Sequence, residues 1–444
     1  MLKRTTALLL VFAALSGAFA ACGENAGIPE TLSFRQITTA RDYVRKDQYV
    51  ICTYPETANA KVNGEMKALI DEMAQRGRSY LPKGKIDLMP SYLDVGVQVF
   101  RTGKKWMSFL TIARIAYERE QVYVDYDART YDMETGSRLK LTDLFSADSP
   151  AWEMMEQAAR EQLSDYFATE QPDPKKLDAL CAREALENAS FTLTPAKIEL
   201  HYRADALYSG KTTLMHVKLY DSVYRPLMTA LGQEITDNSM YKMIALTYDD
   251  GGARGATNNV LDKLRLHGAN ATFFIVGTMM GNNHDVMSRQ QDAGCALASH
   301  NYEHTYENLT QENILRWKEK FNQRMDEIVG VRPAYMRAPG GHFQAFINAE
   351  VGLPLIQWSI ISTDAGSDQV AKIVATVKGN AKDGSVVLMH DINPKAYQYT
   401  DEILTDLENR GFLCVTVDEL FDLYGVPLLE NQVYYSCEEE AARK

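Results

Sequence analysis

Basic residues are in the minority in this 444-residue sequence. It has 47 lysine and arginine residues against 59 aspartate and glutamate residues, and a formal net charge of -12. Proteins bind nucleic acid through basic surfaces that neutralise phosphate groups, so this balance argues against a nucleic-acid partner. The composition is otherwise that of a globular protein, and the length favours two or three domains.

Cysteine is also scarce. The six cysteines lie at positions 22, 52, 181, 295, 414 and 437, and no two of them form a Cys-x-x-Cys pair. This spacing does not predict a zinc–thiolate site, and it does not determine a disulfide pairing. Cys295 and Cys414 fall in apolar, strand-like runs and are best interpreted as structural thiols.

Only one apolar run stands out, and it is too short to span a bilayer. Lys3 and Arg4 precede apolar residues 7–15 and a small-x-small cleavage site at 18–20, which is typical of an export signal. A second interpretation overlaps with it, in which a lipobox ends at Cys22 and that residue becomes a lipid anchor. Both stay open. Both predict an extracytoplasmic protein that is secreted, associated with the cell wall or lipid-anchored at the outer face of the membrane.

The mature chain shows two different patterns of predicted secondary structure. Before a polar stretch at 232–240, the pattern is mixed α+β. After it, short apolar strands alternate with helical segments, which implies parallel strands covered by helices. Seven such strands suit a barrel, and we expect them at 243–247, 272–276, 296–299, 334–337, 355–361, 385–389 and 413–417.

Ionisable residues gather at the carboxyl ends of these expected strands. In α/β barrels, active sites form at that rim from loops that follow different strands. The residues in question are Asp249, Asp250, His300, His304, Arg337, Asp364 and His390. Their clustering predicts an active site there.

Two parts of this set suggest a metal centre. His300 and His304 are four residues apart, so a single helical turn would place them on one face. Together with one carboxylate they would form a His2Asp ligand set that leaves positions for water and substrate. Neighbouring side chains on a strand point to opposite faces, so Asp249 and Asp250 serve one site only if the chain turns, as the glycines after them allow.

These segments resemble, in order, the five motifs of carbohydrate esterase family 4, the NodB-homology polysaccharide deacetylases. They are Thr-Tyr-Asp-Asp-Gly (247–251), His-Asn-Tyr-Glu-His (300–304), Arg-Ala-Pro-Gly-Gly (337–341), residues 358–364 and Leu-Met-His (388–390). The resemblance covers the C-terminal half of the chain. It implies an α/β fold with a distorted (β/α)7 barrel, and hydrolysis of N-acetyl groups on glycans.

The resemblance also implies a role for each residue. Asp249 would be the general base, held by Arg337, and His390 the general acid, paired with Asp364. The remaining positions would be the metal ligands Asp250, His300 and His304, an oxyanion-binding N–H at Gly340 and an acetyl-pocket residue, Leu388. Zn2+ is the default ion for such a set, with Co2+, Ni2+ and Mn2+ as alternatives.

Three positions depart from the family pattern. Gly340 stands where an aromatic residue is usual, Ala365 where a tryptophan is usual, and Ile361 where an acid is common. These departures bear on glycan specificity and rate more than on the type of reaction. His342 lies near the rim, but a histidine in a surface loop is its simpler interpretation.

The N-terminal half has a weaker resemblance, carried by residues 126–145. They are similar to a domain shared by some wall deacetylases and lysozyme-sensing anti-sigma factors. We therefore expect a signal at 1–21, a smaller α+β accessory domain at 45–231, a linker at 232–240, the deacetylase domain at 241–426 and a tail at 427–444. The accessory domain would bind wall glycan, bind a lysozyme-like protein or act as a spacer.

The leading hypothesis is an enzyme that deacetylates a cell-wall or extracellular glycan, most simply the N-acetyl sugars of peptidoglycan, and releases acetate. The alternative is a glycan- or lysozyme-binding sensor with a weak or inactive barrel. A decayed barrel would be expected to have lost some of the metal, base and acid positions. All of them are present.

Overall fold

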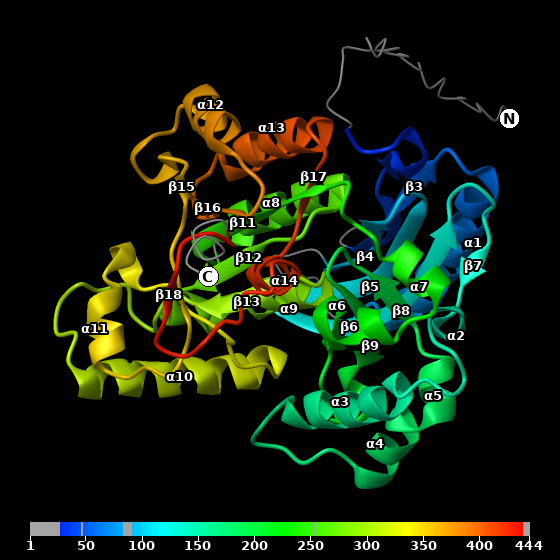
Figure 1. The fold of residues 1–444 in the computed structure, drawn as a ribbon, viewed down its shortest axis with the longest axis horizontal. Helices are drawn as coiled ribbons and strands as arrows, with labels where there is room; N and C mark the ends of the chain where they lie inside the picture. The colour runs from blue at the N-terminus through cyan, green and yellow to red at the C-terminus, as the bar shows by residue number, and fades with distance from the viewer. Residues whose placement is uncertain (1–26, 46–47, 83–90, 253, 438–444) are drawn as a thin grey trace, which may run out of the picture.

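The computed structural model describes residues 27–45, 48–82, 91–252 and 254–437 (Figure 1). The expected export signal and Cys22 lie outside the described residues. Two parts are visible in the fold. A mixed α+β part comes first, and a parallel barrel covered by helices follows it.

A seven-stranded, mostly antiparallel sheet forms the first layer of the N-terminal part. Its order is β1-β3-β4-β5-β6-β7, with β2 paired to β3. The strands are β1 (Phe34–Thr38), β2 (Asp42–Arg45), β3 (Gln48–Thr57), β4 (Ser91–Thr102), β5 (Trp106–Tyr117), β6 (Glu120–Asp132) and β7 (Arg138–Leu139). Helix α1 (Ala60–Gly77) packs on this sheet because Val62, Met66 and Ile70 recur on one face and are buried.

A smaller antiparallel sheet, β10-β9-β8, forms the second layer. Its strands are β8 (Phe191–Leu193), β9 (Lys197–Arg203) and β10 (Leu214–Tyr220). The helices of this region are α2 (Leu141–Leu144), α3 (Ala151–Asp165), α4 (Pro174–Cys181), α5 (Arg183–Glu187), α6 (Asp221–Tyr224) and α7 (Ala230–Ile235). The expected linker at 232–240 begins inside α7. Within it, Asn238 is buried and donates to the carbonyl of Pro195 at 2.9 Å.

The C-terminal part contains a parallel sheet of order β13-β12-β11-β16-β15. Met336 forms single parallel bridges to Ser299 and Leu355, which extend the barrel wall beyond β13. The strands are β11 (Lys242–Asp250), β12 (Thr272–Ile275), β13 (Ala296–Ser299), β14 (Leu355–Ile356), β15 (Ile360–Ile361), β16 (Ser385–His390), β17 (Phe412–Cys414) and β18 (Val433–Tyr434). The prediction of a distorted α/β barrel is confirmed.

Helices cover the outside of this barrel (Figure 1). They are α8 (Arg254–His267), α9 (His284–Asp292), α10 (Gln311–Val329), α11 (Phe343–Asn348), α12 (Val370–Asn380), α13 (Ala396–Asn409) and α14 (Val417–Leu423). Helix α10 begins after Thr310, whose hydroxyl accepts from the backbone N–H of Asn313, and ends at Gly330 with φ 75°.

Four segments differ from the expected organisation. The expected strand 355–361 is split into β14 and β15, and residues 357–359 belong to neither. The segment 334–337 is reduced to the bridges at Met336, because Pro333 and Pro339 flank it and lack backbone N–H donors. β17 is short and pairs with the first residues of β11. The expected tail contributes β18, which pairs with β14 in parallel.

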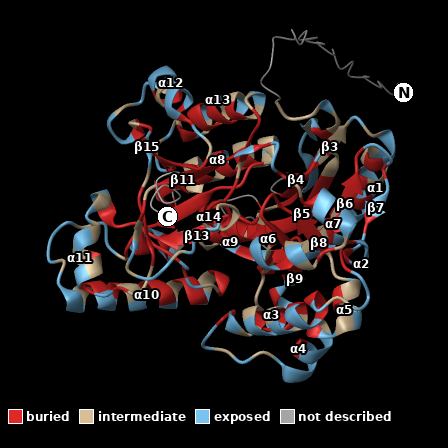
Figure 2. Cartoon of the chain, viewed as in Figure 1, coloured by how far each residue is buried: buried red, intermediate tan, exposed pale blue. Residues whose placement is uncertain are grey.

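The two parts share a continuous hydrophobic core, in which Val97 of β4 clusters with Met243 and Ala245 of β11. Buried residues run along the strands of both parts (Figure 2). Buried ion pairs cross the same boundary, such as Lys197 with Glu419 at 3.1 Å. Within the described residues, no helix has the length and apolar character that crossing a membrane would require. Cys295 is a buried free thiol and Cys414 a partly buried one.

Candidate active site

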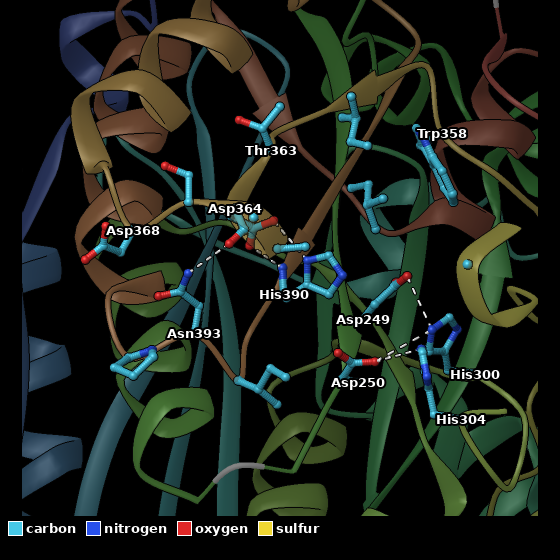
Figure 3. Close-up of a pocket in the computed structure, with 18 of the residues that line it drawn as sticks. Asp249, Asp250, His300, His304, Trp358, Thr363, Asp364, Asp368, His390 and Asn393 are labelled. Carbon is cyan, nitrogen blue, oxygen red and sulfur yellow. Dashed lines mark hydrogen bonds and ion pairs between the residues drawn. The ribbon is translucent and has the colours of Figure 1, made fainter.

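The predicted site residues converge at the carboxyl ends of the barrel strands. Eight of them line a single cavity of about 870 Å³ (Figure 3). They are Asp249, Asp250, His300, His304, Gly340, Asp364, Leu388 and His390. The ninth, Arg337, lies fully buried behind Asp249. Loops that are far apart in the sequence therefore build one site.

Arg337 holds Asp249 in place. Its Nη1 donates to Oδ1 of Asp249 at 2.7 Å, and Asp249 itself is only 3% exposed. The guanidinium also donates to the carbonyls of Ile356 and Gln357, and it stacks 4.0 Å over the ring of Phe274. Because its planar fork is held on several sides, Arg337 orients the carboxylate.

Asp250 is turned away from the regular strand. Its φ is 77°, and Gly251 and Gly252 follow with φ of 66° and 76°. A Cβ atom on Gly251 would lie 3.2 Å from the side chain of Ile275, so the turn passes too close to β12 for a larger residue. The turn starts one residue earlier than the glycines alone suggest. It brings both carboxylates to the same cavity.

Asp250, His300 and His304 form a suitable donor set for a divalent metal ion. One carboxylate oxygen and two imidazole nitrogens lie within 4.8 Å of one another. Nε2 of His300 is 3.7 Å and Nε2 of His304 is 3.6 Å from Oδ1 of Asp250. His300 donates its Nδ1–H to the carbonyl of Arg337 at 2.9 Å, so that Nε2 presents a lone pair toward the carboxylate.

The local structure of the two histidines differs from the expected helical turn. His300 directly follows β13, and the chain through His304 is an irregular loop, with helix α10 beginning only at Gln311. Asn301 has φ 61° and donates to the carbonyl of Glu303 at 2.9 Å. This left-handed turn replaces the helical one and still brings the two imidazole centroids within 5.2 Å.

His390 and Asp364 form the second ionic pair of the cavity. His390 Nδ1 lies 2.9 Å from Oδ1 of Asp364, whose other oxygen accepts from the His390 backbone N–H at 2.7 Å. Although burial alone would lower it, the hydrogen bond and charge of Asp364 raise the pKa of His390 to about 8. The imidazole is therefore mostly protonated at neutral pH.

Two residues that the sequence did not single out support these groups. The Tyr399 hydroxyl donates to Oδ2 of Asp364 at 2.7 Å. Asp391 is fully buried and accepts from Gly251 N–H at 3.1 Å and from the Thr257 hydroxyl at 2.6 Å. Asp391 was visible as the neighbour of His390 in the sequence, whereas Tyr399 lies on a helix and has no local signal.

A third residue, Tyr306, supplies an aromatic ring next to Gly340, the position where an aromatic residue is usual in the family. Gly340 has φ 60°, and a Cβ atom there would lie 2.7 Å from the ring of Tyr306. Tyr306 is 55% exposed, lines the cavity and contacts His304 and His342 edge-on, with centroids 5.4 and 5.2 Å apart. An aromatic wall therefore exists, and it comes from the loop after His304. His342 is exposed, as expected for a surface loop.

The chain is similar to known polysaccharide deacetylases. Residues 236–352 match the family model described as polysaccharide deacetylase. The chain is 29% identical over 316 residues to the peptidoglycan-N-acetylglucosamine deacetylase PgdA of Listeria monocytogenes, covering 68% of this chain and 66% of that relative. It is also 29% identical over 194 residues to the peptidoglycan-N-acetylmuramic acid deacetylase PdaC of Bacillus subtilis, covering 43% of this chain and 41% of the relative.

A shorter relative is matched over most of its length. It is a peptidoglycan-N-acetylglucosamine deacetylase of Bacillus cereus, 32% identical over 200 residues, which make up 42% of this chain and 91% of the relative. The chain thus spans just under two thirds of PgdA, but nearly all of this smaller protein. With the barrel and the metal-ligand set in place, the chain belongs to the polysaccharide deacetylase family.

Proposed function

We propose that this protein is a metal-dependent hydrolase that removes N-acetyl groups from a glycan and releases acetate. The observation that carries the proposal is the convergence of three groups on one cavity. They are an arginine-held carboxylate, a His2Asp ligand set and a protonated imidazole paired with Asp364. Amide hydrolysis needs a base, an electrophile and an acid for the leaving amine.

Each of the chain's own residues has a defined task. Asp249, held in place by Arg337, accepts the proton of the attacking water. His390, kept protonated by Asp364, delivers a proton to the departing amine nitrogen, which is otherwise a poor leaving group. A divalent ion held by Asp250, His300 and His304 would polarise the amide carbonyl and favour ionisation of water. We propose Zn2+, with Co2+, Ni2+ and Mn2+ as alternatives.

Peptidoglycan is the substrate we propose. The names of the matched relatives, which include N-acetylglucosamine and N-acetylmuramic acid deacetylases of peptidoglycan, support this choice. An extracytoplasmic site of action, secreted or anchored through Cys22, follows from the export-type N-terminus and would give access to that polymer. A role of the N-terminal part in contacting glycan or a lysozyme-like protein stays a prediction from the sequence.

The direct test is acetate release. Purified protein lacking residues 1–21 is incubated with N-acetylated peptidoglycan fragments or chitooligosaccharides, and acetate is measured before chelation, after chelation and after addition of Zn2+ or Co2+. We expect release that chelation abolishes and metal restores. If no N-acetyl glycan yields acetate even with metal restored, the glycan-binding sensor becomes the better account.

Tyr306 is expected to contact the sugar. Replacing it with alanine removes the exposed ring beside His304 while leaving the ligand set in place, so KM for the glycan should rise about tenfold with a smaller change in kcat. Tyr397→Ala is the matched control, since that tyrosine lies outside this cavity. Equal KM values for Tyr306→Ala and the unmodified protein would exclude a sugar contact.

A further inference from the structure

A second group of metal-ligand side chains lies outside the cavity, on the small sheet of the N-terminal part. Glu199 and His201 are two residues apart on β9 and so point to the same face, and His216 lies opposite His201 on β10. One ligand atom of each lies within 4.8 Å of those of the other two. Their exposed fractions are 1%, 1% and 4%, and the proposed reaction uses none of them.

The two imidazoles are oriented like metal-binding histidines. Their Nδ1 atoms face each other at 2.9 Å, with ring planes 87° apart. Nε2 of His216 is 2.9 Å from the carbonyl oxygen of Gln291. Because a carbonyl oxygen only accepts, this nitrogen carries the proton and Nδ1 of a neutral His216 presents a lone pair. A ring N–H donated to a backbone carbonyl is the arrangement that orients such ligands.

His201 completes the pair. Its Nε2 lies 2.9 Å from the Thr192 hydroxyl, which can accept as well as donate. When Thr192 accepts, the Nδ1 atoms of His201 and His216 both direct lone pairs into the same space. A cation bound by both nitrogens would offset the repulsion between these lone pairs. When Thr192 donates, a single proton bridges the two nitrogens instead. The imidazole geometry is compatible with either a bound cation or a shared proton. The surroundings of Glu199 favour one of the two.

Glu199 has two buried oxygens, and neither has a hydrogen-bond partner among the described residues. Lys197 lies 3.5 Å away but is nearer to Glu419, at 3.1 Å. A buried carboxylate without donors is costly, and a shared proton on the imidazoles would leave both oxygens unpaired. Coordination of a metal ion uses them.

The surrounding charge is also acidic. Glu199, Glu419 and Asp292 are each 1% exposed. Lys197 pairs with the two glutamates, and Arg114, which is 6% exposed, lines the same small cavity as Asp292, so three buried acids face two buried bases. Asp292, at the end of α9, accepts from the backbone N–H of Leu214 at 2.7 Å, which ties it to β10. A cation would offset this surplus of buried negative charge.

We propose that Glu199, His201 and His216 bind a second divalent transition-metal ion, which stabilises the junction between the N-terminal sheet and the barrel. Two nitrogen and up to two carboxylate oxygen donors suit Zn2+ or Co2+ rather than Mg2+ or Ca2+. The carbonyl that orients His216 belongs to Gln291 of barrel helix α9, so the site links β9 and β10 to the barrel.

The decisive experiment removes the metal ligands of the active-site cavity and measures how much metal the chain still binds. The variant Asp250→Asn/His300→Asn/His304→Asn is produced in medium containing Co2+, purified by gel filtration and analysed for cobalt content and visible absorption. We expect about two cobalt ions per chain in the unmodified protein, and about one, with a Co2+ ligand-field band, in the variant. A folded variant without bound cobalt would overturn the proposal, and this outcome does not depend on acetate release.

A second variant addresses the buried site itself. Glu199→Gln keeps the shape of the side chain but loses its charge, and we expect metal content to fall from two ions to one and Tm to fall with it. The matched control is His267→Asn, which alters a single imidazole held between Asp401 and Glu408 and should keep both ions. A lower Tm with two ions retained would also contradict the site. If Glu199→Gln does not fold, the cobalt count of the triple variant still decides.

Discussion

Replacing Asp249 with asparagine should leave the metal bound and abolish turnover, whereas Asp250→Ala should lose both. Asp249 is held by Arg337 at 2.7 Å and lies 3.7 Å from Nε2 of His300, whereas Asp250 lies within 3.7 Å of Nε2 of both His300 and His304. Loss of a general base costs about 10² to 10⁴ in rate. Metal content by elemental analysis and acetate release on the same samples measure the two effects separately.

The control for this pair is Asp368→Asn. Asp368 also lines the cavity, but its side chain is 79% exposed and pairs with Lys395. The substitution Asp368→Asn removes one negative charge from the rim of the cavity and leaves the three metal ligands unchanged. Metal content and turnover should therefore stay close to those of the unmodified protein. Full turnover in Asp249→Asn would refute the base assignment. Retained metal in Asp250→Ala would refute the ligand assignment.

The second large effect concerns pH. The pKa of His390 is about 8, above its ordinary value, because the hydrogen bond and charge of Asp364 outweigh burial. Catalysis that needs the protonated imidazole should therefore be sustained below pH 8 and fall as pH rises through that value. In Asp364→Asn, burial still lowers the pKa of His390, and only the weaker attraction of Asp249 and Asp250 opposes it. The decline should therefore begin at lower pH, and the loss at pH 8 should exceed the loss at pH 6.

The full pH profile of kcat is the measurement. The alkaline limb is the part of the profile in which kcat falls as pH rises. Each pH unit by which this limb moves to lower pH corresponds to about a tenfold lower rate at a fixed alkaline pH. Tyr399→Phe removes one of the hydrogen-bond donors to Asp364 and should shift the alkaline limb by less than Asp364→Asn does. Asp368→Asn serves again as the charge-matched control. An unshifted limb in Asp364→Asn would mean that His390 is not the group that titrates.

Much of the barrel and its rim could be predicted from local patterns. Short apolar runs such as 243–247 and 385–389 became β11 and β16, and the acids and histidines that follow such runs reached one cavity. Parallel strands force this outcome, because their carboxyl ends meet at the same edge. A residue's place just after a strand therefore indicates its place in the molecule.

The conformations of the loops could not be predicted from such local patterns. The spacing of His300 and His304 suggested a helical turn, but Asn301 adopts a left-handed conformation and hydrogen-bonds within the loop. Spacing does not distinguish a helical turn from a loop that brings the same rings together. The wall supplied by Tyr306 was similarly hidden, since it depends on the space above Gly340, which another segment of chain fills.

By itself, the sequence determined the order of strands and helices, the residue types at the rim and hence the chemistry available there, because these depend on neighbours along the chain. Only the tertiary structure decided which side chains support them. Tyr399 contacts Asp364 and Asp391 contacts Gly251 across long stretches of sequence, and Glu199, His201 and His216 gather where two separately patterned parts pack together. Such contacts arise from packing in three dimensions, and no local periodicity encodes them.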